Sequence, residues 1–355
     1  MAAVGGLTLL GFALRLADFN QSLFADELST YWIVHGRSLG SVVSHVRSND
    51  EITPPLFFVL GWLTLKLGSA PEWVRLPSLI AGTLSIPLIY ALGVRTVGRL
   101  AGLLGAAIMA LSPFMIYYST EARSYAVMIA LLIGSTLALL AAVRGGGARW
   151  WAVYALCSCA TLYSHYTAVF ALAAQFLWVL WAHRETLRPL LVANVAVLVG
   201  FAPWIPGFIA DNNSPTTDLL SRLQPFTLDA VTRAFENWSV GYPYSSVDTL
   251  PGALAWSLIA AGVLVAATAC AVRGWRWLRG PTAGVRRAAR RAPSGVVLIA
   301  MLALATPVGE AIVSAIGPTQ VLGARNLNAS WPGLALGIGA LVTAAGGRWR
   351  LRARG

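Results

Sequence analysis

Apolar stretches alternate with short polar segments along nearly the whole chain. A helix needs about 20 apolar residues to cross the ~30 Å hydrocarbon core of a bilayer. The apolar stretches lie at residues 2–17, 75–94, 100–118, 124–143, 150–182, 189–206, 251–272, 294–316 and 326–345. The pattern therefore predicts an all-α polytopic membrane protein.

Two stretches do not fit a single crossing. Residues 150–182 would form a helix about 50 Å long at ~1.5 Å per residue, so we expect a hairpin that turns near Ser164-His165-Tyr166. Residues 54–67 contain Lys66 and are too short to span, so we expect a helix at the membrane surface. The count is then about ten transmembrane helices, with extracytoplasmic amphipathic helices in a first outer loop at residues 18–74.

Arginine placement tests this topology, because short cytoplasmic loops are enriched in lysine and arginine. With the N-terminus inside, the inner segments contain most of the 26 basic residues, whereas among the 14 acidic residues only Glu185 lies there. Counting residues 54–67 as a span would put the later arginine clusters outside. We therefore expect both termini in the cytoplasm. The N-terminal stretch has no positive n-region or clear cleavage site, so we expect a first span, not a removed signal peptide.

The composition agrees with a protein that is dissolved in lipid. Apolar residues make up 57% of the chain and charged residues 11%, and the mean hydropathy is +0.67, which excludes an ordinary soluble domain. The net charge of +12 does not indicate nucleic-acid binding, because the basic residues lie in short clusters between apolar stretches. The near absence of lysine is typical of a GC-rich, bacterial gene. The three cysteines lie inside apolar stretches, which argues against a disulfide or a zinc site.

Polar residues of the predicted outer side gather in three segments. These are residues 24–31 with Asp26 and Glu27, residues 49–56 with Asp50 and Glu51, and residues 112–125 with Tyr118, Glu121, Arg123 and Tyr125. Adjacent carboxylates can simply favour a helix start, and Glu121 with Arg123 could form a solvated loop pair. However, His165, Glu310 and Arg325 also lie in or beside predicted spans, where ionisable groups usually line a functional cavity.

The order of the motifs resembles that of bacterial GT-C glycosyltransferases of the family 39 type, which are related to protein O-mannosyltransferases and the lipid A aminoarabinose transferase. The motifs are Asp26-Glu27, Thr53-Pro54-Pro55-Leu56, Val74-Arg75-Leu76-Pro77-Ser78, Ser112-Pro113, Tyr117-Tyr118-Ser119, Glu121-Ala122-Arg123-Ser124-Tyr125 and Leu162-Tyr163-Ser164-His165-Tyr166-Thr167. The resemblance covers residues 5–205 well and residues 324–332 weakly. It implies a catalytic membrane module at residues 1–206, an extracytoplasmic loop at 207–250, and C-terminal transmembrane helices with a basic cytoplasmic loop and tail at 251–355.

The resemblance also implies an activity. A sugar would move, with inversion, from a polyprenyl-phosphate-linked donor to a lipid, glycan or protein acceptor on the extracytoplasmic face of the plasma membrane. The acidic residue of the family's first loop is the catalytic base, and its position here is Asp26, with Glu27 beside it. The chemistry agrees, because one carboxylate must take the acceptor proton and cations must hold the departing phosphate.

The remaining candidates divide between donor and acceptor. Arg123 and Arg325 suit a phosphate, because a guanidinium matches its oxygens. Further donor candidates are Glu121, Tyr125, His165 and Lys66, and candidates for the acceptor or the loop are Asp50, Glu51 and Tyr118. His165 could equally be a structural histidine. No cluster demands a metal, although outer carboxylates could hold Mg²⁺ or Mn²⁺.

The sequence departs from the family's pattern in two places. Relatives often have histidine or lysine where this chain has Thr53, so Lys66 could supply the missing contact. Many relatives also carry a soluble C-terminal domain, so acceptor recognition would rest here on residues 20–51 and 207–250. The aromatic residues of the second segment, Trp238, Tyr242 and Tyr244, could stack on a sugar or lie at the headgroups.

Two other function classes compete with an enzyme. A transporter or lipid flippase would also gather polar residues in a membrane cavity, but such proteins usually show internal repeats, and none is evident here. The ionisable residues also concentrate at the outer edge of the predicted bilayer. A non-catalytic relative acting as an assembly partner is the third alternative.

Overall fold

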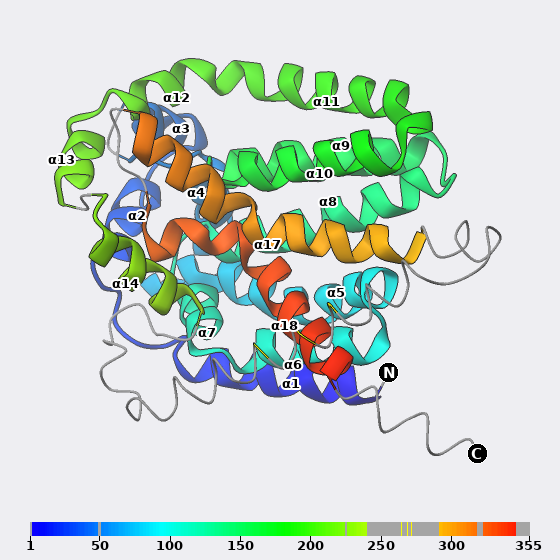
Figure 1. The fold of residues 1–355 in the computed structure, drawn as a ribbon. Helices are drawn as coiled ribbons and strands as arrows, with labels where there is room; N and C mark the ends of the chain where they lie inside the picture. The colour runs from blue at the N-terminus through cyan, green and yellow to red at the C-terminus, as the bar shows by residue number, and fades with distance from the viewer. Residues whose placement is uncertain are drawn as a thin grey trace, which may run out of the picture.

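Helices make up every regular element in the parts of the chain that the structure describes (Figure 1). The structure is a computed structural model, and it describes residues 2–48, 51–223, 226–239, 291–317 and 322–345, with three single residues at 264, 268 and 271. The elements in these ranges are α- and 3₁₀-helices. The prediction of an all-α fold is confirmed.

Several helices are long and apolar enough to cross a bilayer. Among the described residues, five segments meet this condition by length and composition: Pro71–Thr96, Tyr125–Val143, Arg184–Asn212, Ser294–Ile316 and Ala324–Ala344. They correspond to the helices α5 (Leu76–Thr96), α8 (Tyr125–Val143), α11 (Leu187–Phe201), α17 (Arg291–Ile316) and α18 (Trp331–Ala345). The chain is thus a polytopic membrane protein, whereas the number ten stays a prediction, because the expected span at 251–272 lies almost wholly outside the described residues.

The long apolar stretch at residues 150–182 forms the predicted hairpin. Helix α9 (Ala148–Ser164) ends just before His165, and α10 (Ala168–Ala182) begins three residues after His165. Helix α9 packs against α8 and α11, and α10 packs against α17. The turn therefore lies where the length argument placed it.

The predicted span at residues 100–118 is broken in two. Helix α6 (Arg99–Leu111) and α7 (Pro113–Thr120) meet at an angle of 59°. Ser112 caps α7, because its hydroxyl oxygen accepts a hydrogen bond from the Met115 N–H at 3.4 Å. Pro113 fits the first position of α7, where its missing N–H has no partner to lose.

A buried arginine donates hydrogen bonds to the backbone carbonyls at the end of α6. Arg15 in α1 (Ala2–Ala17) is fully buried and donates hydrogen bonds to the carbonyl oxygens of Met109 at 2.9 Å and Ala110 at 3.2 Å. The last carbonyls of a helix have no partner within it, and a cation is favourable there. Arg15 therefore stabilises the break that directs α7 toward the first outer loop.

Residues 18–74, the predicted first outer loop, fold into a small helical unit at one end of the bundle (Figure 1). It contains α2 (Asp26–Val34), α3 (Leu39–Arg47), α4 (Leu56–Thr64), and the 3₁₀-helices η1 (Leu65–Leu67) and η2 (Pro71–Arg75). Its apolar core includes Ile33, Val42, Val46, Phe57, Phe58 and Val74. The short helix expected at residues 54–67 is present, packed against α2, α3 and α5, and its place relative to the membrane stays a prediction.

The segment expected as an extracytoplasmic loop, residues 207–250, contains short helices in its described part. It consists of α12 (Ile205–Asn212), α13 (Pro215–Leu223) and α14 (Leu228–Ser239), and residues 240–250 lie outside the described ranges. Arg222 pairs with Asp218 and Arg233 pairs with Asp229 at helical i,i+4 spacing, which supports α13 and α14. The sequence missed α13 and α14 because they are polar and short.

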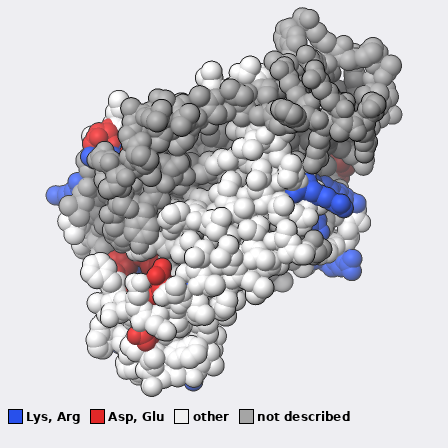
Figure 2. All heavy atoms as spheres, turned by 90° about the horizontal axis from the view of Figure 1, so that it is seen from below, with Lys and Arg blue, Asp and Glu red and all other residues white. Residues whose placement is uncertain are grey.

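Charge is distributed unevenly between the two ends of the bundle. In Figure 2, most of the visible acidic side chains lie toward the end that carries α2 and α13, and the largest visible group of arginines lies toward the opposite end. Figure 1 places the start of α1 and the end of α18 at that opposite end. This arrangement agrees with the separation of arginine-rich and acidic segments that the sequence predicts. The assignment of the arginine-rich end to the cytoplasm stays a prediction.

Candidate active site

Helix α2 begins with two adjacent carboxylates. It lies at the end of the bundle that holds the predicted first outer loop. Ala25, the residue before them, has a φ of 45°, which is rare for a residue other than glycine. Such strain persists where the surroundings fix the backbone, and it is frequent at functional sites. Because successive residues of a helix point about 100° apart, Asp26 and Glu27 face different partners.

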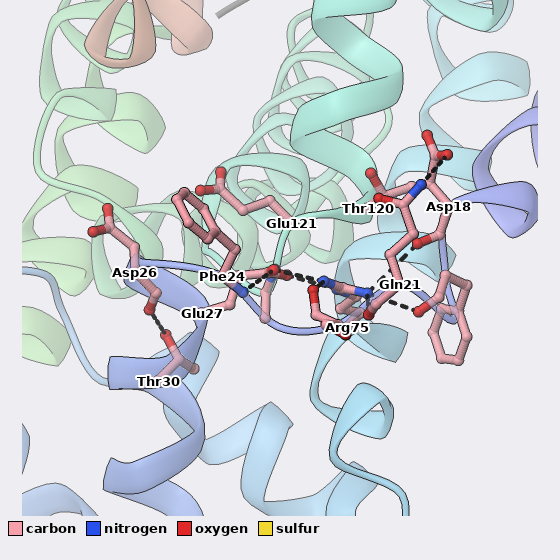
Figure 3. A network of polar contacts seen from close by, with 12 residues as sticks. Asp18, Gln21, Phe24, Asp26, Glu27, Thr30, Arg75, Thr120 and Glu121 are labelled. Carbon is pink, nitrogen blue, oxygen red and sulfur yellow. Dashed lines mark hydrogen bonds and ion pairs between the residues drawn. The ribbon is translucent and has the colours of Figure 1, made fainter. Parts of the chain in front are cut away.

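Glu27 is held by an arginine and by backbone amides (Figure 3). The Arg75 guanidinium donates to both Glu27 carboxylate oxygens at 2.6 Å. The N–H groups of Ala122 and Phe24 donate to the same carboxylate at 2.8 and 3.2 Å. Both charged side chains are buried, so Glu27 joins α2, η2 and the turn after α7 in one hydrogen-bonded network.

Arg75 also fastens the segment that leads into α2. Its terminal nitrogens donate to the carbonyl oxygens of Phe19 at 2.9 Å, Gln21 at 2.5 Å and Ser22 at 3.1 Å. These carbonyls belong to irregular backbone between α1 and α2, where no regular helix supplies partners for them. The position of Asp26 therefore depends on Arg75, for which the sequence assigned no role.

Asp26 is the more open of the two carboxylates. Its side chain is 46% exposed, and one of its oxygens lies 3.3 Å from a terminal nitrogen of Arg325, whose side chain is 33% exposed. Arg325 comes from η6 (Ala324–Ser330), almost 300 residues later in the chain. The fold thus brings together two candidates that the sequence placed at opposite ends.

Arg123 faces a buried carboxylate. Its two terminal nitrogens donate to the Glu51 oxygens at 2.6 and 3.1 Å, and both side chains are buried. Burial raises the pKa of Glu51, but the Arg123 charge and hydrogen bonds outweigh it, so the pKa lies below its ordinary value. Arg325 is therefore the more exposed of the two arginines expected to hold phosphate. Asp50, the neighbour of Glu51, lies outside the described residues.

Glu121 follows α7 and has no arginine bound to it. It is 9% exposed, its Oε2 is buried without a hydrogen-bond partner, and its Oε1 lies 3.5 Å from the Tyr117 hydroxyl. Burial raises the pKa of this carboxyl to about 7, with Asp26 and Glu27 adding to the rise and Arg123 and Arg325 opposing it. A protonated Glu121 can donate a hydrogen bond.

Aromatic side chains and a neutral histidine surround this group. Tyr118 and Tyr125 are buried and pack edge to face with ring centroids 4.7 Å apart, and the His165 ring lies 5.3 Å from Tyr125. Burial, followed by the nearby Arg123 and Arg325 charges, lowers the pKa of His165 to about 3. The Thr167 N–H donates to Nδ1 at 3.3 Å, so the histidine proton resides on Nε2.

Two predicted residues do not join this group. Lys66 lies beyond the far end of α4, about 15 Å along the helix from the motif that precedes α4, and its ammonium sits 3.3 Å from the centroid of the Trp62 ring. Trp238 is 5% exposed, so its ring has no free face for a sugar or for the headgroups. Tyr242 and Tyr244 lie outside the described residues.

The sequence missed a second polar network near the hairpin turn. The Tyr166 hydroxyl donates to the Asp211 carboxylate, and the Trp204 ring N–H donates to the Tyr166 hydroxyl at 2.9 Å. This network ties the turn between α9 and α10 to α12. Tyr166 was part of a recognised motif, but nothing in the sequence signalled Asp211 as its partner.

No group of three or more histidine, cysteine, aspartate and glutamate side chains lies together in a metal-binding arrangement within the described ranges. The carboxylates of Glu27 and Glu51 are already engaged by arginines. A requirement for Mg²⁺ or Mn²⁺ stays a hypothesis.

Comparison with known proteins gives one family and several solved structures. The family model of dolichyl-phosphate-mannose-protein mannosyltransferases matches residues 53–206. No curated protein matches the chain. The residues matched by the family model include the second motif, the Glu121-to-Tyr125 segment and the hairpin turn.

The solved structures include the archaeal oligosaccharyltransferase AglB from Archaeoglobus fulgidus in complex with an inhibitory peptide and a dolichol-phosphate, which is 12% identical with a TM-score of 0.56. The alignment covers 99% of this chain and 51% of AglB. The apo form of the A. fulgidus enzyme gives 11% identity, the same coverage and a TM-score of 0.55. ArnT from Cupriavidus metallidurans bound to undecaprenyl phosphate is 15% identical over 98% of this chain and 77% of its own, with a TM-score of 0.42. The chain spans about half the length of the oligosaccharyltransferase, and at these identities the likeness to it shows the fold.

Proposed function

We propose that this chain, which has the GT-C membrane fold expected from its motif order, is an inverting glycosyltransferase. It moves a sugar from a polyprenyl-phosphate-linked donor to an acceptor on the extracytoplasmic face. The family model and the dolichol-phosphate bound to AglB support a lipid-phosphate donor. The observation that carries the proposal is the contact between Asp26 and Arg325. Both side chains are partly exposed, and the contact lies beside two buried ion pairs.

Asp26 is the base. It takes the proton from the acceptor hydroxyl as that oxygen bonds to the anomeric carbon of the sugar. The bond from this carbon to the phosphate oxygen breaks, the electron pair stays on the phosphate, and a single displacement inverts the configuration. Glu27 is unsuited to this role, because its oxygens already accept bonds from Arg75, Ala122 and Phe24.

Arg325 holds the departing phosphate. A guanidinium binds phosphate oxygens through charge-assisted hydrogen bonds, and this attraction strengthens as negative charge develops on the leaving group. The contact with Asp26 is long, at 3.3 Å, and both side chains are partly exposed, so a phosphate can approach Arg325 without breaking a buried pair. Arg123 would have to leave Glu51 to do the same.

The buried pairs position these two groups. The Glu27–Arg75 pair fixes the first turn of α2, which carries Asp26, and the Glu51–Arg123 pair fixes the segment before α4 against the turn after α7. Positioning of this kind contributes several kcal/mol to catalysis when it holds reacting atoms in place. Glu27, Arg75, Glu51 and Arg123 are thus positioning residues in this mechanism.

The test replaces Asp26 by asparagine. Asp26→Asn keeps the size of the side chain and removes the base, so we expect sugar transfer to fall about 10²- to 10⁴-fold while the melting temperature and donor binding stay near those of the unchanged protein. Asp18→Asn is the matched control, because Asp18 belongs to the same outer loop and is hydrogen-bonded to Gln21. Full transfer activity in Asp26→Asn would refute the mechanism.

A further inference from the structure

Four carboxyl groups lie near one another at the candidate site, and three of them contact an arginine. Glu27 contacts Arg75, Glu51 contacts Arg123, and Asp26 contacts Arg325. Glu121 is the exception among the described residues, since no cation lies within ion-pair distance of it. Figure 3 shows its carboxyl pointing away from the Glu27–Arg75 pair, with no hydrogen bond drawn to it.

Burial without a cation favours the neutral form of this carboxyl. Moving a carboxylate out of water is costly, and a group without a counter-ion responds by keeping its proton. The charged groups that face Glu121 are Asp26 and Glu27 from α2, Arg123 from the turn after α7, and Arg325 from η6. The two carboxylates raise the pKa of Glu121 and the two guanidinium groups lower it, but burial is the largest influence, and the pKa is raised to about 7.

The unpaired Oε2 of Glu121 is suited to a phosphate site, where the protonated carboxyl can donate a hydrogen bond. Oε2 is buried and has no hydrogen-bond partner, although buried polar atoms are nearly always paired. A phosphodiester is an anion that only accepts hydrogen bonds, so an ionised carboxylate would repel it and a carboxylic acid would donate to it. The same anion would attract Arg325, which acts on Glu121 through space.

We propose that Glu121, in its protonated form, donates a hydrogen bond to a phosphate oxygen of the lipid-linked donor, while Arg325 binds the same phosphate. This role rests on the proposed function for its ligand, and it adds a coupling between donor binding and one proton. The donor phosphate therefore binds more tightly when Glu121 is protonated and more weakly when Glu121 is ionised. Arginine does not titrate in the range of interest, and His165, with its pKa near 3, is already neutral there.

The experiment measures binding of polyprenyl methyl phosphate to the detergent-solubilised full chain by isothermal titration calorimetry between pH 5.5 and 9. This sugar-free diester has no group that titrates in that range, so any pH dependence belongs to the protein. For the unchanged protein we expect a nearly constant affinity below pH 7 and a loss approaching about tenfold per pH unit above it. Glu121→Gln keeps a hydrogen-bond donor without a titrating proton, so its affinity should stay near the low-pH value throughout.

Three results would overturn the proposal. One is the same alkaline loss of affinity in Glu121→Gln as in the unchanged protein. The second is found without any variant: titrations at pH 8 in two buffers of different ionisation enthalpy should show uptake of close to one proton on binding, and no uptake would contradict the role of Glu121. Binding that requires added Mg²⁺ would also contradict it.

The probe separates this inference from the proposed function. If the chain binds the diester with the expected proton uptake but transfers no sugar from any donor, the proposed function fails and the role of Glu121 stands. If the chain transfers sugar while diester binding is independent of pH, the role of Glu121 fails and the proposed function stands.

Discussion

Arg75→Met should destabilise the protein far more than the loss of an exposed arginine. The substitution keeps an unbranched apolar side chain and removes the guanidinium that holds Glu27 through two bonds of 2.6 Å. Glu27 would then be a buried carboxylate with two backbone amides and no cation. Breaking a buried ion pair by removing one partner costs about 3–5 kcal/mol, because the other charge stays buried and uncompensated.

The assay is the free energy of unfolding in mixed micelles titrated with a denaturing detergent. The matched control is Arg233→Met, which removes an arginine from an i,i+4 pair with Asp229 in which both side chains are about two-thirds exposed; such pairs contribute about 0–1 kcal/mol. The double variant Glu27→Leu with Arg75→Met should recover part of the loss, because it leaves no orphan charge. If Arg75→Met falls within about 1 kcal/mol of the control, Glu27 and Arg75 do not form the buried clamp described here.

Two further predictions test the surroundings of the site. His165→Gln should flatten the pH dependence of stability between about pH 4 and 6.5: the folded histidine has a pKa near 3, so the unfolded chain takes up its proton first, near pH 6.5, and stability falls as the pH is lowered through that range. Thermal melts of both proteins at pH 4.5 and 7 check this, and an equal change in both would contradict it. Gly93→Val should destabilise α5 against α6 by about 1–3 kcal/mol or more, since a Cβ there would lie 2.4 Å from the Gly102 Cα. Gly337→Val is the control, because no heavy atom lies within 4 Å of its Cβ position, and similar losses in the two variants would refute the packing argument.

The all-α fold and the hairpin could be predicted from the sequence, because hydropathy and the length of an apolar stretch can be read from local sequence. The 33 residues from Trp150 to Ala182 are too many for one crossing, and the chain turns at His165 as expected. The motif order also predicted the GT-C fold, which the structural likeness to AglB confirms.

The partners of the charged residues could not be predicted in the same way. In the sequence Asp26 and Glu27 look equivalent, and only the rotation between adjacent helical residues and the placement of Arg75 and Arg325 separate them. Arg123 looked like an open phosphate ligand because Glu51 is 72 residues away in the chain and becomes its neighbour only in the fold.

Arg15 shows the same limit for the fold itself. Ser112-Pro113 is a local signal for a helix start, but the sequence contains no local sign that an arginine in the first helix satisfies the carbonyls of Met109 and Ala110. Contacts of this kind depend on how the helices pack, and packing is not encoded in periodicity alone.

The most direct test of the central claim is to incubate the purified protein with a panel of polyprenyl-phosphate sugars and of lipid and glycan acceptors, and to follow donor consumption and the anomeric configuration of the product. The account predicts that at least one donor is consumed, that free polyprenyl phosphate is released, and that the product has the inverted configuration. A product with retained configuration, or no consumption of any donor by a folded protein that binds the phosphodiester probe, would contradict it.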